Sequence, residues 1–210
     1  AADREGVDDF DVALAAFVVN SCSRSGIVTA NAGPIGGKNQ RGRWHVGSRW
    51  NGPALAERLR RVHGLAPRIR FTEGNAIEHI ETLDGTCGIE DEMFSCVDPP
   101  YLREGNRLYA NGMTEDDHRR LAAALRESPA RWLLTYDDEP LVCESLYPTE
   151  RFLAYEIANT ANRQRVAVEY AVFSDNCHLP LDPRLLDRGD AIWMRDWDEN
   201  PASPFHAHAV

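Results

Sequence analysis

The sequence predicts an α/β fold built around an open, Rossmann-like sheet. A short apolar run, Met93 to Val97, has the length and composition of a buried parallel strand, and it stops at Asp98. A helix pattern opens behind Thr114, which forms a capping-box pattern with Asp117, and a second strand pattern follows at Trp132 to Tyr136. This order of strand, helix and strand is typical of parallel sheets, whose ligands bind beyond the carboxyl ends of the strands.

The segment before the first strand is predicted to contain two helices with an irregular stretch between them. Residues 10–19 have the apolar spacing of a short helix, whereas residues 20–52 are rich in Gly, Asn and Arg and have no clear periodicity. Asn51 and Pro53 mark the start of the second helix, which is expected to end at Gly64. Its expected core-facing stripe consists of Leu55, Leu59, Val62 and His63. The remaining predicted elements in this part are a strand at residues 68–72 and a helix at 75–83.

The segment after the second strand predicts a short helix and an antiparallel hairpin. The helix begins near Pro140 and runs to Tyr147, and strand patterns at 152–157 and 166–173 follow, joined by a polar connection. The aromatic residues expected in the core are Trp132, Tyr155 and Phe173. After Asp175 the pattern fades, so the tail is expected to wrap the surface or to be partly disordered.

Bulk composition is typical of one ordinary globular domain. The chain has 210 residues, of which 43% are hydrophobic and 27% charged, enough apolar material for a core. It has no apolar run of about 18 residues and no secretory-signal pattern at its start, so we expect a cytoplasmic protein. The five scattered cysteines form no C-x-x-C pair, which argues against a disulfide framework or a zinc site.

Charge is distributed unevenly along the chain, although the net charge is −10. Residues 21–72 contain ten basic residues against one acid, Glu57, while the rest of the chain contains 13 basic and 32 acidic residues. A local excess of +9 on an acidic protein indicates a surface for a polyanion such as nucleic acid. For Arg58 to Arg61, an ordinary solvated helix face explains the charge equally well.

The strongest chemical motif is Asp98-Pro99-Pro100-Tyr101 at the end of the first strand. The exocyclic amine of adenine is a poor nucleophile because its lone pair is delocalised into the ring, and two hydrogen-bond acceptors can hold it in a more reactive geometry. A carboxylate accepts one N–H, and a carbonyl fixed by proline accepts the other. An adjacent tyrosine offers a face on which a flipped base can stack. The bland alternative is a tight Asp-Pro-Pro turn after a strand.

In this motif and its surroundings the sequence resembles the Dam-like (class alpha) family of adenine-N6 DNA methyltransferases, whose catalytic motif is D-P-P-Y. The likeness covers roughly residues 10–175. Within it, Phe17 to Ile27 looks like the family's asparagine-to-glycine segment. Further matching stretches are Ala32 to Gly37, Gly42 to Trp44, Arg49 to Asn51, Tyr109, the helix with His118 and Leu121, and Trp132 to Asp138.

The resemblance implies a Rossmann-like methyltransferase sheet and transfer of a methyl group from S-adenosylmethionine to the N6 amine of a flipped adenine in double-stranded DNA. Asp98 and the Pro99 carbonyl would bind the amine, Pro100 would complete the rigid turn, and Tyr101 would stack on the base. The displacement would be direct, without a covalent enzyme intermediate. The residues implied in cofactor binding are Asn75, Asp98 and Tyr101.

The resemblance also implies a target-recognition segment upstream of the motif, where the basic excess lies. We expect residues 1–19 to be a helical lead-in, 20–67 the recognition segment, 68–175 the catalytic portion and 176–210 a tail. Basic candidates for phosphate or base contacts are Arg24, Lys38, Arg41, Arg43 and Arg49. Asn39 or Gln40 could read an adenine edge.

Two features of the family are absent from the sequence. No F-x-G-x-G loop or acidic ribose-binding residue precedes the motif, and Asn75 stands where the family has an acidic residue for the cofactor. Without the two strands that carry these features the sheet would have costly unpaired edges. We therefore expect an incomplete sheet that an upstream segment or a second chain completes, unless the protein is a degenerate relative.

Two other functions compete with adenine methylation. A DNA-binding or specificity subunit would keep the basic segment but would have lost cofactor binding. Methylation of cytosine N4 or of protein glutamine is less favoured, because those families have Ser or Asn where Asp98 stands. His118 fits a helix-packing role as well as a catalytic one, and His206 and His208 lack neighbours that would complete a metal site.

Overall fold

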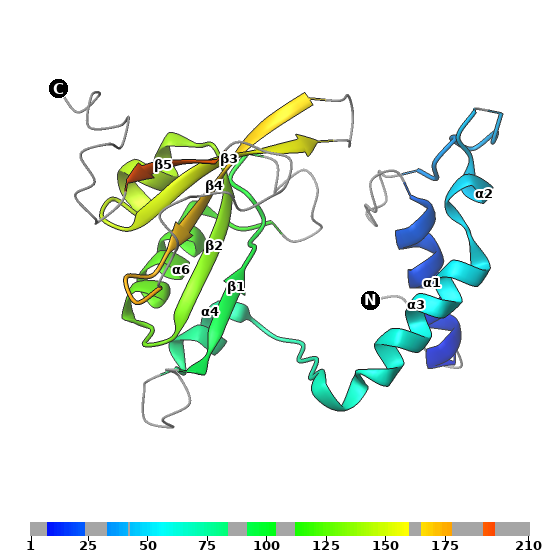
Figure 1. The fold of residues 1–210 in the computed structure, drawn as a ribbon, viewed down its shortest axis with the longest axis horizontal. Coiled ribbons are helices and arrows are strands. Elements are labelled where there is room, and N and C mark those ends of the chain that lie inside the picture. Colours follow the sequence, from blue (N-terminus) through cyan, green and yellow to red (C-terminus); the bar gives the residue numbers. More distant parts are fainter. Residues whose placement is uncertain are drawn as a thin grey trace. The chain divides into compact units, whose positions relative to one another are not determined.

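The computed structural model describes residues 8–23, 33–41, 43–83, 92–103, 112–159, 165–177 and 191–195. The chain divides into two compact units, residues 1–73 and 74–210, and each is described by itself (Figure 1). Of the helices in the described ranges, none is both long and apolar enough to cross a membrane.

Unit 1 is helical. It contains α1 (Asp9–Cys22), the single turn α2 (Val46–Arg49), α3 (Gly52–Gly64) and a 3-10 turn, η2 (Ala66–Arg68). Side-chain caps explain where the long helices start: Asn51, predicted as a helix start, accepts from Ala54 N through Oδ1, and Asp8 Oδ1 accepts from Phe10 N. Directly after α1, Ser23 forms an antiparallel bridge with Pro34.

Two expectations for unit 1 are wrong. The strand predicted at 68–72 is absent, because the chain leaves η2 without pairing to any described strand, and Phe71 is 89% exposed. Alternating Ile69 and Phe71 favour extended backbone, but a strand also needs a hydrogen-bonded partner. The predicted stripe on α3 is not a core face either, since Leu59 and Val62 are more than half exposed.

Unit 2 is a mixed α/β structure with one five-stranded sheet. The strands are β1 (Phe94–Val97), β2 (Arg131–Asp137), β3 (Arg151–Asn159), β4 (Arg165–Phe173) and β5 (Ala191–Arg195). Their order across the sheet is β1-β2-β4-β3-β5. β1 and β2 are parallel, and every other neighbouring pair is antiparallel. A sheet with such a parallel pair is compatible with the predicted Rossmann-like fold, and the predicted hairpin of β3 and β4 is confirmed.

Helix α6 (Glu115–Glu127) makes the parallel pairing possible, because parallel neighbours need a long crossover. Its predicted capping box forms, with Thr114 Oγ1 accepting from Asp117 N and Asp117 Oδ2 accepting from Thr114 N. Figure 1 shows α6 against one face of the sheet, near the short helix α4 (Ala76–Glu81). The core between them includes Ile77, Ile80, Leu121, Leu125, Trp132, Leu134 and Tyr136.

The opposite face of the sheet carries a second, smaller core. Its buried members are Leu153, Ala171, Phe173, Cys177 and Trp193, with Leu133 and Tyr155 packed beside them. Alternation of side chains along each strand therefore separates two apolar clusters. The predicted core positions Trp132 and Phe173 are confirmed as buried, and Tyr155 is half-buried.

The helix predicted from Pro140 to Tyr147 is confirmed: residues 140–141 are α-helical and continue into a π-helical turn, η4 (Val142–Leu146). Two expectations for unit 2 need correction. β1 is parallel but not buried: in the described part it pairs only with β2, and Phe94 is 59% exposed. The tail is not wholly irregular, because Ala191–Arg195 forms β5, which buries Trp193 against the second core.

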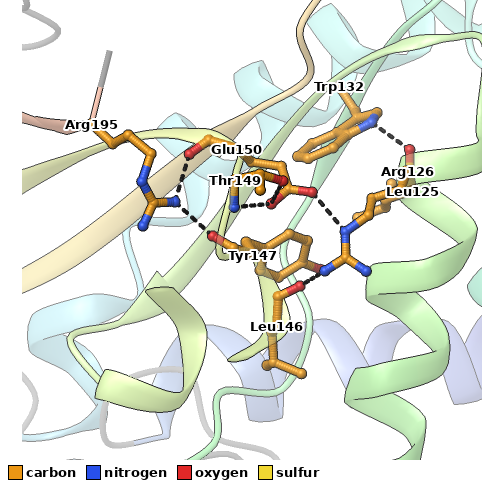
Figure 2. A network of polar contacts seen from close by, with 8 residues as sticks. All are labelled: Leu125, Arg126, Trp132, Leu146, Tyr147, Thr149, Glu150 and Arg195. Atoms are coloured by element: carbon orange, nitrogen blue, oxygen red, sulfur yellow. Dashed lines mark hydrogen bonds and ion pairs between the residues drawn. The ribbon is translucent and has the colours of Figure 1, made fainter. Parts of the chain in front are cut away.

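The end of the sheet where β2 begins, called here the amino end, is held by a polar network (Figure 2). The Glu150 carboxylate is 6% exposed and accepts from Arg126 Nε at 2.6 Å and from Thr149 N at 3.1 Å. Arg195 Nη1 donates to the carbonyls of Tyr147 at 2.9 Å and Glu150 at 3.0 Å. Helix α6, the turn before β3 and strand β5 are thereby joined around one buried carboxylate.

Candidate active site

The candidate site lies at the opposite, carboxyl end of the sheet, where β1 and β2 finish. Parallel pairing sets Val97 beside Leu134, so the chain leaves both strands at the same edge. Asp98 follows β1 directly, and Asp137 is the last residue of β2. This is the edge at which open α/β sheets bind their ligands.

Asp98 and Pro99 supply hydrogen-bond acceptors at this edge. Asp98 is exposed, and its Oδ1 accepts from Thr135 Oγ1 at 2.7 Å, which fixes the carboxylate. Pro99 is buried, so the turn that follows is anchored by packing as well as by its ring. No described residue donates to Asp98 Oδ2 or to the Pro99 carbonyl oxygen. Two acceptors on consecutive residues are therefore available to a ligand.

Strand register brings four further polar residues to the same face of the sheet. Thr135 and Asp137 alternate with the buried residues of β2 and share one face. Glu169 of β4 lies directly opposite Asp137, and Tyr155 of β3 lies directly opposite Glu169. The three strands thus line the site with a hydroxyl, two carboxylates and a phenol.

Glu169 joins Tyr101 to the sheet. Its Oε2 accepts from the Tyr155 hydroxyl at 2.8 Å and from the Tyr101 hydroxyl at 3.2 Å. Burial raises the pKa of the Glu169 carboxyl above its usual range, and the two hydroxyls oppose that rise by stabilising the charged form. Burial likewise raises the pKa of Tyr101 and of Tyr155, so both phenols are neutral donors.

The Tyr101 ring packs on the aromatic side of the main core. Its centroid lies 6.1 Å from that of Tyr136, whose hydroxyl is 2.6 Å from His118 Nδ1. His118 is 2% exposed, and burial lowers the pKa of its imidazole. Of the two roles expected for His118, the structure gives it helix packing beneath the site.

Arg103 ties the segment after the motif to the end of β2. Its backbone N donates to Asp137 Oδ2 at 3.0 Å, its Nε pairs with Glu139, and its Nη1 lies 3.9 Å from Asp138 Oδ1. Asp137 Oδ1 is buried and has no described partner. Burial raises the pKa of the Asp137 carboxyl above its usual range, while the Arg103 N–H opposes the rise.

Asn75, the third residue expected to bind the cofactor, caps α4. Its Oδ1 accepts from Ile77 N at 3.0 Å, and its Nδ2 donates to Glu78 Oε1 at 3.3 Å. In the described part of unit 2, no hydrogen bond joins Asn75 to Asp98 or Tyr101. The structure therefore brings two of the three predicted residues together and gives the third a local structural role.

Most of the predicted DNA-contacting residues lie on the surface of unit 1. Lys38, Asn39 and Arg41 are exposed on the turn that follows the Ser23–Pro34 bridge. Gln40 differs, because its Nε2 donates to the carbonyls of Ile35 and Gly37 while its Oε1 accepts from Val46 N at 2.9 Å. With the amide committed inside the turn, Gln40 organises the surface that its neighbours present.

The rest of that surface is shaped by Gly36 and Trp44. Gly36 has φ +84°, and a Cβ there would lie 2.5 Å from the Trp44 carbonyl oxygen, so only glycine fits. Arg43 lies over the exposed Trp44 ring, with 5.4 Å from Cζ to the ring centroid, and Arg49 is exposed in the last turn of α2. Arg24 lies outside the described residues.

Sequence reasoning missed Thr135, Asp137, Tyr155 and Glu169. Asp137 carried a usable signal, because an acid directly follows the predicted strand 132–136. Glu169 carried a weaker one, as the only acid inside an otherwise apolar strand pattern. Pairing Glu169 with Tyr101 required the register of two antiparallel ladders.

No model of a known protein family matches the sequence, and no curated protein matches it at a significant level. The assignment of a function therefore depends on the residues of the site.

Proposed function

We propose that this chain is the catalytic and target-recognition part of an adenine-N6 DNA methyltransferase that uses S-adenosylmethionine. The observation that carries the proposal is the pair of acceptors, Asp98 Oδ2 and the Pro99 carbonyl, which have no described donor and adjoin the Tyr101 ring. A methyltransferase-type Rossmann-like sheet belongs to the same proposal, as does a cytoplasmic location with the DNA.

An adenine amine has two N–H bonds, and the site has two acceptors on consecutive residues. When both hydrogens are held, the nitrogen lone pair is drawn out of conjugation with the ring and becomes nucleophilic. S-adenosylmethionine supplies an electrophilic methyl group, which leaves the sulfonium sulfur as the new nitrogen–carbon bond forms. Asp98 Oδ2 accepts the proton that the amine then loses, and Thr135 keeps the carboxylate in place through Oδ1.

The charges at the site fit a cationic methyl donor. Asp98 and Asp137 end neighbouring strands, Glu169 lies opposite Asp137, and Asp137 Oδ1 is buried without a described donor. A sulfonium with its amino group would be attracted to such a surface. The product loses the sulfonium charge, so the same carboxylates would favour its release.

The basic surface of unit 1 fits the phosphate backbone of DNA. Lys38, Arg41, Arg43 and Arg49 are exposed, and none of them forms an ion pair with a described acid. By contrast, Arg60 and Arg61 on α3 both pair with Glu57. The first group is therefore the better candidate for phosphate contacts, whose strength falls as salt rises.

A second candidate function is a DNA-binding subunit that has lost the cofactor. The observation that favours it is Asn75, whose carbonyl oxygen is committed to capping α4. Isothermal titration with S-adenosylmethionine separates the two functions, because the subunit would release no heat of binding.

The direct test is methyl transfer from S-[methyl-³H]adenosylmethionine to unmethylated double-stranded DNA of mixed sequence. We expect N6-methyladenine with the wild type and none above background with Asp98→Ala. Asp175→Ala is the matched control, because Asp175 is an exposed aspartate in the turn at the amino end of the sheet. If the wild type binds DNA but forms no methylated base, the enzyme proposal fails.

A further inference from the structure

Tyr101 depends on a residue far along the chain for its orientation. Its hydroxyl bonds to Glu169, 68 positions away, at 3.2 Å, and the same Glu169 oxygen accepts from Tyr155 at 2.8 Å. Tyr155 and Glu169 are directly paired across β3 and β4, so the hairpin carries a preformed acceptor for the loop that follows β1.

We propose that Glu169 is a positioning residue that sets the plane of the Tyr101 ring, and that Tyr155 braces Glu169. The inference rests on the proposed function, in which this ring is the stacking surface for the flipped adenine. In this role Glu169 acts on the base through Tyr101.

The contacts hold the ring at two points. The hydroxyl is fixed by a hydrogen bond to a carboxylate, which is stronger than one between neutral groups. The ring packs against Tyr136, at 6.1 Å between centroids, and Tyr136 is itself held by His118. A tyrosine side chain has two rotatable bonds, so a hydroxyl anchor and a ring contact together select one orientation.

Besides Tyr101, the only described hydrogen-bond partner of the Glu169 carboxylate is Tyr155. Glu169 is half-buried, lies directly opposite Asp137, and has no described cationic partner. Like charges directly opposite each other on a sheet destabilise it. A carboxylate at this position disfavours folding, which is expected of a residue that serves a site and not of one that serves the core.

A double-mutant cycle tests the proposal through kcat/KM for DNA in the tritium assay. Glu169→Ala and Tyr101→Phe should each lower kcat/KM by about tenfold, the range for one hydrogen bond to a charged group. The double variant should be no slower than the slower single variant, because both changes break the same bond. Glu169→Gln retains an acceptor and should recover most of the rate. If the two losses multiply, Glu169 does not act through Tyr101 and the proposal is wrong.

A second measurement does not depend on methylation. In protein labelled with 3-fluorotyrosine, the ¹⁹F signal of Tyr101 is identified by its loss in Tyr101→Phe. Glu169→Ala should shift this signal, whereas Asp175→Ala should not. An unchanged signal overturns the positioning role even in an active enzyme. If the signal shifts but the protein methylates no DNA, the proposed function is rejected. The inference that Glu169 orients Tyr101 is then retained.

Discussion

At the amino end of the sheet, one buried carboxylate accepts hydrogen bonds from several donors. At the carboxyl end, three carboxylates lie together and have few described donors. Glu150 receives Arg126 and the Thr149 backbone, and Arg195 binds the carbonyls around it (Figure 2). From the described residues, Asp98 and Glu169 accept side-chain hydrogen bonds only from hydroxyls, and Asp137 Oδ1 accepts none.

We infer from this difference that the amino end serves folding and, under the proposed function, that the carboxyl end serves the ligand. A buried carboxylate that is fully paired joins elements, so its removal should be felt in stability. Partly paired carboxylates with raised pKa values make the fold less stable and are characteristic of ligand sites. Substitutions at the two ends should therefore divide cleanly into those that change stability and those that change activity.

The largest expected effect is that of Asp98→Ala on activity. Loss of one acceptor for the reacting amine should lower methyl transfer at least about 100-fold, the range seen when a group that stabilises a transition state is removed. Because Asp98 is exposed, the free energy of unfolding should change by less than about 0.5 kcal/mol. Tritium transfer and urea unfolding of the same samples measure both. A large loss of stability would mean that the carboxyl end also serves folding.

The next effect belongs to the amino end. Arg126→Ala leaves Glu150 buried without its cation, so the free energy of unfolding should fall by about 3 kcal/mol, as when one partner of a buried ion pair is removed. Arg119→Ala is the matched control on the same helix, because its pair with Glu115 is exposed and should change stability by less than about 1 kcal/mol. Equal effects of the two substitutions on urea unfolding would contradict the distinction between the ends.

Glu169→Gln should change stability in the opposite direction. The pKa of Glu169 is raised in the folded state, so the folded protein binds the proton more tightly than the unfolded chain does. The stabilisation that this tighter proton binding gives the folded protein is fully present below the pKa of Glu169 in the unfolded chain. It is lost as pH rises through the higher pKa of Glu169 in the folded state. Near neutral pH the variant should therefore be as stable as the wild type, or more stable by up to about 1 kcal/mol.

That advantage of the Glu169→Gln variant should shrink as pH falls and the wild-type carboxyl takes up its proton. The groups that face Glu169 are Asp98, Asp137, Tyr101 and Tyr155, and both proteins contain all four. Thermal unfolding of both proteins between pH 4.5 and pH 8 (roughly the range above the ordinary carboxyl pKa) follows the difference. A wild type that gains on the variant as pH rises would show that the charge stabilises the fold.

Much of the fold could be predicted because its signals are local. The caps at Thr114 and Asn51 and the apolar strand patterns need no knowledge of distant contacts. β5 could not be found, because only Trp193 of Ala191–Arg195 is buried and its partner strand lies 40 positions earlier, by the Leu153–Trp193 pairing. Likewise, Arg68 to Thr72 has a strand composition but no described partner strand.

The candidate site divides in the same way. Asp98 and Tyr101 are adjacent in one motif and could be recognised from the sequence, whereas Glu169 and Tyr155 join them only through the register of β2, β4 and β3. The helix cap at Asn75 could have been predicted from the sequence, because Asn75 precedes a helix pattern just as Asn51 does. Resemblance suggested a ligand-binding role at a position where helix capping already explains the residue.

Of these substitutions, Arg103→Ala should have the smallest effect on activity and stability. It is the most sensitive test of the difference between the two ends of the sheet. Arg103 is more than half exposed, so its ion pairs with Asp138 and Glu139 should contribute less than about 1 kcal/mol to stability. The hydrogen bond from its backbone N–H to Asp137 survives the substitution, but the motif loop loses its two side-chain ion pairs with the residues that follow β2. We expect a loss of a few-fold in kcat/KM for DNA, with unchanged urea unfolding. Arg119→Ala, which removes a similarly exposed pair on α6 that does not involve the motif loop, should leave kcat/KM unchanged and change stability by less than about 1 kcal/mol. An equal loss of activity in that control would show that the effect of Arg103 is not specific to the site.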